Sequence, residues 1–246
     1  MKLTAGRLLA WFIVVTFVTF AAQPLLAQRG EVLQRTAREL PAPVQTYRSV
    51  HDRLAPKEAI QHLVKGIEHT QRQQHSEAEA SFREALNVYP DFDTAHAALG
   101  ESLIAQERWD DAQHVAAHAL DKAPTHPSLL RLMAAIQQHF KHYEESLKLL
   151  RRSLSVEPRN EPALSMLARA EYRTGDCPNA IVHARHAHEA TLHLNPIVHL
   201  VSAACFESAA HLEDAKVEYE IFLREAPDDL AAEVIRRRIR EIAAGN

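Results

Sequence analysis

Residues 93–126 read DTAHAALGESLIAQERWDDAQHVAAHALDKAPTH, and this stretch decides the fold. Apolar and small residues recur at helical spacing over 95–103, and the same pattern returns over 112–120. Pro124 follows the second pattern, and proline cannot continue a helix. The stretch therefore predicts two antiparallel helices joined by a short turn. A single helix pair cannot bury its apolar face alone, so neighbouring pairs must stack on it.

The same residue types recur every 34 residues, as the spacing of Pro90, Pro124 and Pro158 shows. Small residues stand 24 and 12 positions before each proline, and a ring-bearing side chain stands 15 positions before it. These three rows are Gly66, Gly100 and Ala134; Ala78, Ala112 and Ser146; and His75, Trp109 and Tyr143. The register then absorbs one extra residue and ends at Pro227. We interpret the small residues as points of close approach between the two helices of a repeat.

A 34-residue period with a small residue in each helix and a closing proline resembles the tetratricopeptide repeat family. The resemblance implies an all-α fold, a right-handed α-solenoid of five helix-turn-helix repeats with a C-terminal capping helix. The domains expected are a signal segment (1–27), a helix or linker (28–57), the repeat array (58–229, with repeats 59–92, 93–126, 127–160, 161–195 and 196–229) and a capping helix (230–246).

Residues 1–27 are predicted to be a cleaved export signal. Lys2 and Arg7 give a positive start, and an apolar stretch follows over 8–22. The alternative is an inner-membrane anchor formed by residues 8–26. We favour cleavage because a membrane span needs about 20 apolar residues, and the stretch over 8–22 is shorter than that. The repeats are predicted to lie outside the cytoplasm in either case, as a periplasmic or secreted protein.

Composition and motifs argue against several classes of function. The formal net charge of −4 does not suggest nucleic acid as a partner. No nucleophile, general base or phosphate-binding loop is recognisable, so we predict no enzymatic activity and no cofactor. Sixteen histidines include pairs one helical turn apart, but no carboxylate or cysteine recurs beside them, and we predict no specific metal site. The pairs are His114 with His118, His139 with His142, and His183 with His186.

The two cysteines, Cys177 and Cys205, leave two interpretations open in an exported protein. Both occupy repeat positions that face neighbouring helices. A disulfide needs Cα atoms within about 7 Å, and an offset of one helical turn would exceed that distance. We favour two buried thiols over a disulfide.

The resemblance also implies that the first helices of successive repeats line a concave groove. The residues at the lining positions are Ile60, Leu63 and Ile67 in repeat one, Arg131, Gln138 and His139 in repeat three, and Arg169, Tyr172 and Arg173 in repeat four. Arginines beside a tyrosine can bind the carboxylates of an extended or helical segment. The alternative is that these arginines are solvated residues paired with Glu101 and Glu207.

The predicted function is a non-enzymatic scaffold or adaptor that binds a peptide or helix of another protein in this groove. By resemblance, exported proteins of this kind serve secretion, pilus, outer-membrane or cell-wall assembly. Two alternatives stay open: a histidine-rich metal-binding envelope protein that uses His183 and His186, and a membrane-anchored structural subunit of an envelope complex. Neither the identity of the partner nor the oligomeric state follows from the sequence.

Overall fold

The computed structural model describes residues 49–190 and 195–245, and all regular structure in these ranges is helical. The predicted signal, 1–27, and residues 28–48 of the predicted linker lie outside the described residues. No helix in the described ranges is long and apolar enough to span a membrane.

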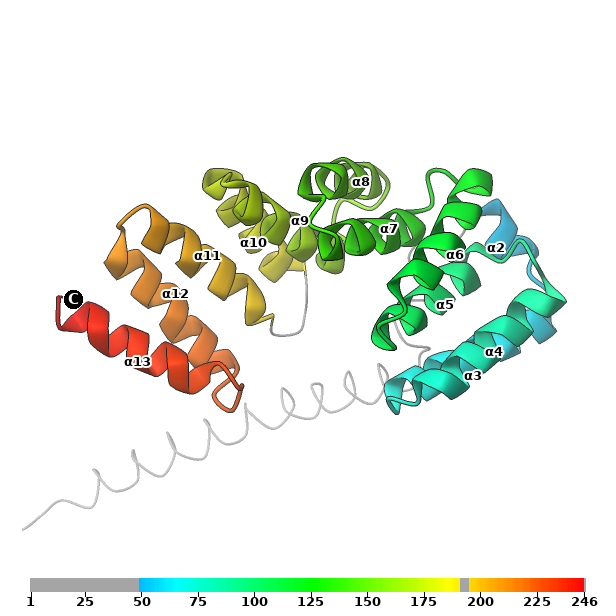
Figure 1. The fold of residues 1–246 in the computed structure, drawn as a ribbon, viewed down its shortest axis with the longest axis horizontal. Coiled ribbons are helices and arrows are strands. Elements are labelled where there is room, and N and C mark those ends of the chain that lie inside the picture. Colours follow the sequence, from blue (N-terminus) through cyan, green and yellow to red (C-terminus); the bar gives the residue numbers. More distant parts are fainter. Residues whose placement is uncertain (1–48, 191–194, 246) are drawn as a thin grey trace, which may run out of the picture. The chain divides into compact units, whose positions relative to one another are not determined.

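Ten helices form five consecutive pairs, which confirms the predicted all-α repeat array (Figure 1). The pairs are α3 (Lys57–Gln71) with α4 (His75–Val88), α5 (Asp93–Ala105) with α6 (Trp109–Lys122), α7 (Pro127–His139) with α8 (Tyr143–Val156), α9 (Glu161–Thr174) with α10 (Cys177–Ala190), and α11 (Ile197–Ser208) with α12 (Leu212–Glu225). A short helix, α2 (Val50–Leu54), precedes the pairs, and α13 (Ala232–Ala243) packs on α12 after them.

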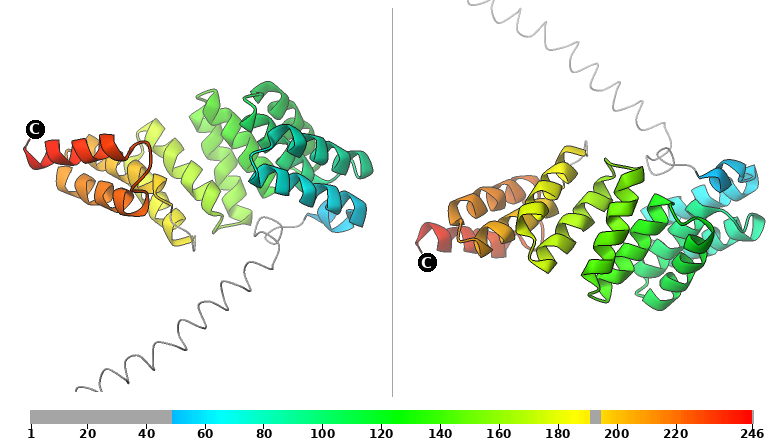
Figure 2. Two further views of the ribbon diagram at one scale, coloured as in Figure 1. Left: turned by 90° about the horizontal axis from the view of Figure 1, so that it is seen from below. Right: turned by 90° about the horizontal axis from the view of Figure 1, so that it is seen from above.

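From α3 onward each helix contacts the next one along the chain, and each first helix also contacts the first helix of the following repeat. The helices α3, α5, α7, α9 and α11 therefore form a continuous row (Figure 2). Side chains at corresponding positions of successive first helices thus come close together although they are about 34 residues apart in the sequence.

The turn inside each repeat closes in the same way. One residue per turn adopts a positive φ, between 59° and 87°. The following residue donates its N–H to the carbonyl five residues earlier, as from Arg108 to Leu103 at 2.9 Å. The positive-φ residues are Gln73, Glu107, Lys141, Gly175 and Ala210. The first four keep the 34-residue spacing, and the last falls one residue later, where the sequence predicts an insertion.

Two glycines are required by close helix approach, and the partner of one of them, Gly100, differs from the one expected. A β-carbon at Gly66 would overlap the ring of Phe82 on α4, the second helix of the same repeat. A β-carbon at Gly100 would instead overlap the side chain of Leu132, which lies on α7 of the next repeat. The row of small residues therefore serves contacts within a repeat and contacts between repeats. Phe82 and Leu132 are both fully buried in the same hydrophobic cluster.

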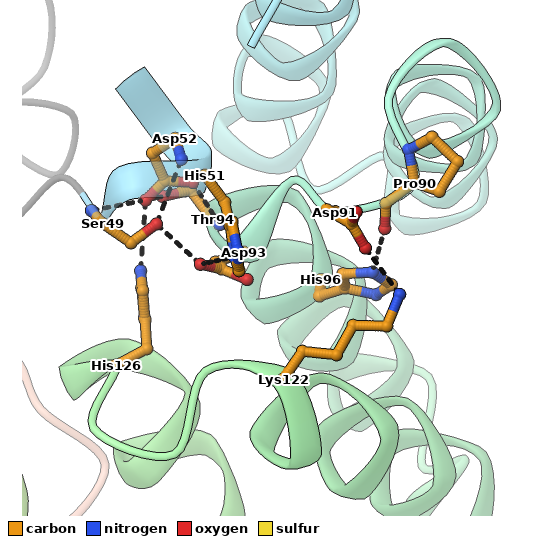
Figure 3. A network of polar contacts seen from close by, with 10 residues as sticks. All are labelled: Ser49, His51, Asp52, Pro90, Asp91, Asp93, Thr94, His96, Lys122 and His126. Atoms are coloured by element: carbon orange, nitrogen blue, oxygen red, sulfur yellow. Dashed lines mark hydrogen bonds and ion pairs between the residues drawn. The ribbon is translucent and has the colours of Figure 1, made fainter. Parts of the chain in front are cut away.

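A polar network joins α2 to the starts of α5 and α7 (Figure 3). Asp52 accepts hydrogen bonds from the Thr94 N–H and hydroxyl, both at 2.9 Å, and lies 3.2 Å from Nε2 of His126. Ser49 donates to Asp93 at 2.6 Å. Burial by itself raises the pKa of Asp52, but the hydrogen bonds from His126 and Thr94 outweigh it and lower the pKa. The network explains how three polar side chains are buried at this end of the array.

We expect Gly66→Ala to lower the free energy of unfolding by about 1 kcal/mol, the difference between two opposing effects. An alanine in a helix interior is intrinsically better than glycine by about 1 kcal/mol. Overlap with the buried Phe82 ring costs about 1–3 kcal/mol and reverses the sign. Urea denaturation measures the difference.

The matched control is the pair Gln61→Gly and Gln61→Ala, at an exposed position of the same helix. In this pair alanine must be the more stable residue, because nothing overlaps its β-carbon. A stabilising Gly66→Ala, comparable to the difference at position 61, would contradict the close approach.

Candidate functional site

A hollow of about 500 Å³ lies where α7 and α9 meet the starts of α6 and α8. Its lining contains four of the nine predicted groove residues. The lining residues are Ile104, Trp109, Ala135, Gln138, His139, Tyr143, Arg169 and Arg173. The structure thus brings four of the six predicted residues of repeats three and four to one place.

Stacked rings form one wall of this hollow. The Trp109 and His139 rings have centroids 3.8 Å apart and planes 10° apart. Trp109 begins α6 and is only half-buried, because one part of its ring packs on the core while the rest borders the hollow. Phe140 meets His139 edge-on at 5.1 Å. An apolar, π-rich surface of this kind suits apolar or aromatic side chains of a ligand.

Two arginines on α9 form the opposite, cationic wall. The guanidinium of Arg169 donates to Oε1 of Gln138 at 2.9 and 3.2 Å. Gln138 is itself held by its donations to Ser146 and to the Met166 carbonyl. The guanidinium of Arg173 lies over the ring of Tyr143, 5.4 Å from its centroid. Within 49–190 and 195–245, neither arginine forms an ion pair. Both keep their charge available to a carboxylate.

The third predicted arginine does not share this environment. Arg131 donates to Glu101 at 2.6 Å and is largely buried. The other acid expected to neutralise the groove, Glu207, pairs instead with Arg238 of α13 at 2.7 Å. Arg131 is therefore paired with an acid, as the alternative interpretation expects, whereas Arg169 and Arg173 are not paired with Glu101 or Glu207.

The predicted groove residues of repeat one belong to the packing of the array. Leu63 is 2% exposed and lies in the same core cluster as Phe82, so a partner cannot contact it. Ile60 and Ile67 are half-buried against that cluster. The expectation that Leu63 lines a groove was wrong because its side chain packs in a core cluster with residues of α4 and α5. The repeat pattern alone cannot show what covers an end repeat.

A second hollow, of about 630 Å³, contains Tyr172 and both cysteines. Both thiols are free, Cys205 buried and Cys177 half-buried at the edge. Burial, together with hydrogen-bonding contact to Cys177, raises the pKa of the Cys205 thiol. The thiols are thus neighbours, and the expected offset of one turn was wrong. Of the two predicted buried thiols, only Cys205 is fully buried.

None of the three predicted histidine pairs forms a metal-ligand cluster in the described part of the chain. His114 and His118 are exposed, and His139 is stacked on Trp109. His142 is hydrogen-bonded to Gln137. Nδ1 of His183 lies 2.7 Å from the fully buried carboxylate of Glu171. This histidine holds a buried acid in place.

Sequence reasoning missed the other four lining residues of the first hollow, and two of these, Trp109 and Tyr143, provide its aromatic rings. Trp109 and Tyr143 start second helices, and the tight turn carries these starts to the edge of the first-helix row. The sequence feature that could have identified them is the ring-bearing residue that recurs 15 positions before each repeat proline.

The described chain is an α-helical repeat protein. Residues 69–136 match the Tetratricopeptide repeat family model. The repeated helix pairs of the described chain have the fold of a tetratricopeptide repeat solenoid. No curated protein sequence matches it significantly.

Solved structures of other repeat proteins share the fold. PilF of Pseudomonas aeruginosa is 17% identical with a TM-score of 0.66, over 76% of this chain and 85% of its own. PilW, a type IV pilus biogenesis factor, is 19% identical with a TM-score of 0.61, over 73% and 83%. YrrB, a repeat protein with an unusual peptide-binding site, is 14% identical with a TM-score of 0.55, over 73% and 92%. At these identities the likeness shows the fold alone.

We expect Cys177 to react with a thiol reagent at least about tenfold faster than Cys205 in the native protein, because thiolate formation and access both control the rate. Cys177→Ser should remove the fast reaction, and Cys205→Ser should keep it. Loss of all thiol reactivity until a reductant is added would instead indicate a disulfide.

Proposed function

We propose that the protein is a non-catalytic adaptor that binds a segment of another protein in the hollow between α7 and α9. The observation that carries the proposal is the pair Arg169 and Arg173, which lack carboxylate partners among the described residues and lie beside the Trp109–His139 stack. A guanidinium without a carboxylate partner can bind a carboxylate of the ligand through charge-assisted hydrogen bonds. The stack provides an adjacent surface for an apolar or aromatic side chain.

The ligand that fits is an acidic peptide segment, extended or helical, with an apolar residue near a carboxylate. Gln138 restrains Arg169, and Tyr143 supports Arg173, so little side-chain freedom is lost on binding. Repeat arrays generally bind along such surfaces of first helices, and YrrB carries a peptide-binding site by its own description. These points support the proposal without identifying the partner.

We place the repeats outside the cytoplasm, because residues 1–27 have the charge and apolar pattern of an export signal. PilW, with a similar fold, is a pilus biogenesis factor, which makes an envelope assembly role a reasonable extension. The mass of the chain recovered from its source cell tests export. A chain that starts at Gln28 supports cleavage, whereas one that retains Met1 supports the membrane anchor.

A capture experiment tests the binding site. The full chain, immobilised through a C-terminal tag, is exposed to envelope extract from the source cell. We expect a bound protein that the double variant Arg169→Glu and Arg173→Glu loses by at least about tenfold, since like charges then face the ligand carboxylate. Added salt should weaken the wild-type complex, because exposed charges are screened.

The matched control is Arg185→Glu with Arg224→Glu, which makes the same charge change at exposed positions of the second helices α10 and α12. This control should retain the partner, and both variants should keep the helicity of the wild type. Equal capture by all three chains would refute a role for the hollow, as would the absence of any captured protein.

A further inference from the structure

Three side chains from three consecutive helices converge where repeats four and five meet. His188 lies in the last turn of α10, His199 in the first turn of α11, and Glu225 at the end of α12. Their nitrogen and oxygen ligand atoms all lie within 4.8 Å of one another. The convergence depends on the stacking, since the three residues share no local sequence spacing.

The facing atoms of this cluster are buried and have no hydrogen-bond partner within the described ranges. They are Nδ1 of His188, Nε2 of His199 and Oε2 of Glu225. His199 as a whole is only 8% exposed. Buried polar atoms are almost always hydrogen-bonded, and leaving one unsatisfied costs about 1–3 kcal/mol. Three such atoms aimed at one another therefore require a ligand or an explanation.

The spacing of these atoms does not suit direct hydrogen bonds. Nε2 of His199 lies 3.7 Å from Oε2 of Glu225, and Nδ1 of His188 lies 4.0 Å from Oε1. Two ligands on one tetrahedral zinc ion, each about 2.0–2.1 Å from the metal, are about 3.3 Å apart. Small side-chain rotations would bring all three atoms to that separation.

A fourth side chain orients one of the histidines. Nδ1 of His199 lies 2.7 Å from a carboxylate oxygen of Glu218, two turns before the end of α12. A proton on Nδ1 that is donated to Glu218 leaves Nε2 as a lone pair that faces Glu225. A carboxylate that holds the far nitrogen of a histidine in this way is the usual support of a metal-bound imidazole.

We propose that His188, His199 and Glu225 bind a divalent transition-metal ion, with Zn²⁺ the best match, and that Glu218 is a positioning residue for His199. Two imidazoles and one carboxylate are ligands that zinc accepts, and they leave a fourth position for water or for a group of a partner. The side chain of His188 is 40% exposed, which gives the ion a route from solvent. The bound ion would link the last helices of repeats four and five, independently of the proposed peptide site.

The other cluster of potential ligands, Asp52, Asp93 and His126, does not support the same inference. Its carboxylates receive hydrogen bonds from Ser49 and Thr94 and face His126, so the cluster is already explained as the junction between α2, α5 and α7 (Figure 3).

Zinc titration of the full chain, produced without a polyhistidine tag, tests the proposal in competition with a chromophoric chelator. We expect one tight site, a thermal unfolding midpoint that rises with Zn²⁺, and reversal by a chelator. His199→Gln and His188→Gln should each weaken that site at least about a hundredfold, and Glu218→Gln about tenfold, the range found for supporting residues. Because His188 is partly exposed, its variant keeps the test decisive if His199→Gln fails to fold.

The matched control is the double variant His114→Gln and His118→Gln, which removes two exposed histidines one turn apart on α6. It should leave the tight site and its thermal stabilisation unchanged. Zinc affinity that is unchanged in His188→Gln, or that is lost equally in the control, would overturn the proposal. The absence of any site tighter than about 10 µM, well outside the range of structural zinc sites, would also overturn it.

Discussion

The close approach of α-helices at positions without a large side chain is the constraint on which the rest of this structure depends. At Gly66 the ring of Phe82 occupies the space that a side chain would fill, and at Gly100 the side chain of Leu132 does so. The first contact sets the distance between the two helices of a repeat, and the second sets the distance between neighbouring repeats. Since protein interiors are close-packed, neither distance can relax without a cavity or an overlap.

This constraint sets the positions of the two proposed sites. The first helices form a continuous row because each contacts the next, and so Gln138 on α7 meets Arg169 on α9. The tight turn brings Trp109 at the start of α6 against His139 of the following repeat. The cationic and aromatic walls of the hollow are therefore supported by packing. The same stacking joins His188, His199 and Glu225, which come from three different helices.

The periodic features of the sequence predicted the periodic features of the fold. The spacing of the prolines, the small residues and the helical apolar pattern predicted the helix pairs, because packing requires the same features in each repeat. A shift of that spacing by one residue predicted the insertion. The positive-φ position of each turn escaped prediction, since only Gly175 among the five is a glycine. A left-handed residue costs roughly 1–2 kcal/mol, and the closing hydrogen bond and helix packing override that cost at Gln73, Glu107, Lys141 and Ala210.

The candidate sites were only partly predictable, because their properties depend on neighbours that the period does not specify. Arg131 and Arg169 were both predicted to line the groove, yet Glu101 neutralises only Arg131. Leu63 matched a groove position but is covered at the end of the array. The cluster of His188, His199 and Glu225 was invisible because its members lie at unrelated sequence spacings. The histidine pairs that the sequence shows one turn apart are instead mostly exposed residues.

Hydrogen–deuterium exchange of the protein with and without its captured partner tests the central claim most directly, because it needs no substitution. The account predicts slower exchange in α7 and α9 around residues 138–139 and 169–173, with little change in α4, α10 and the C-terminal half of α6. Protection confined to the second helices, or to α13, would contradict it and would place the binding surface elsewhere on the array.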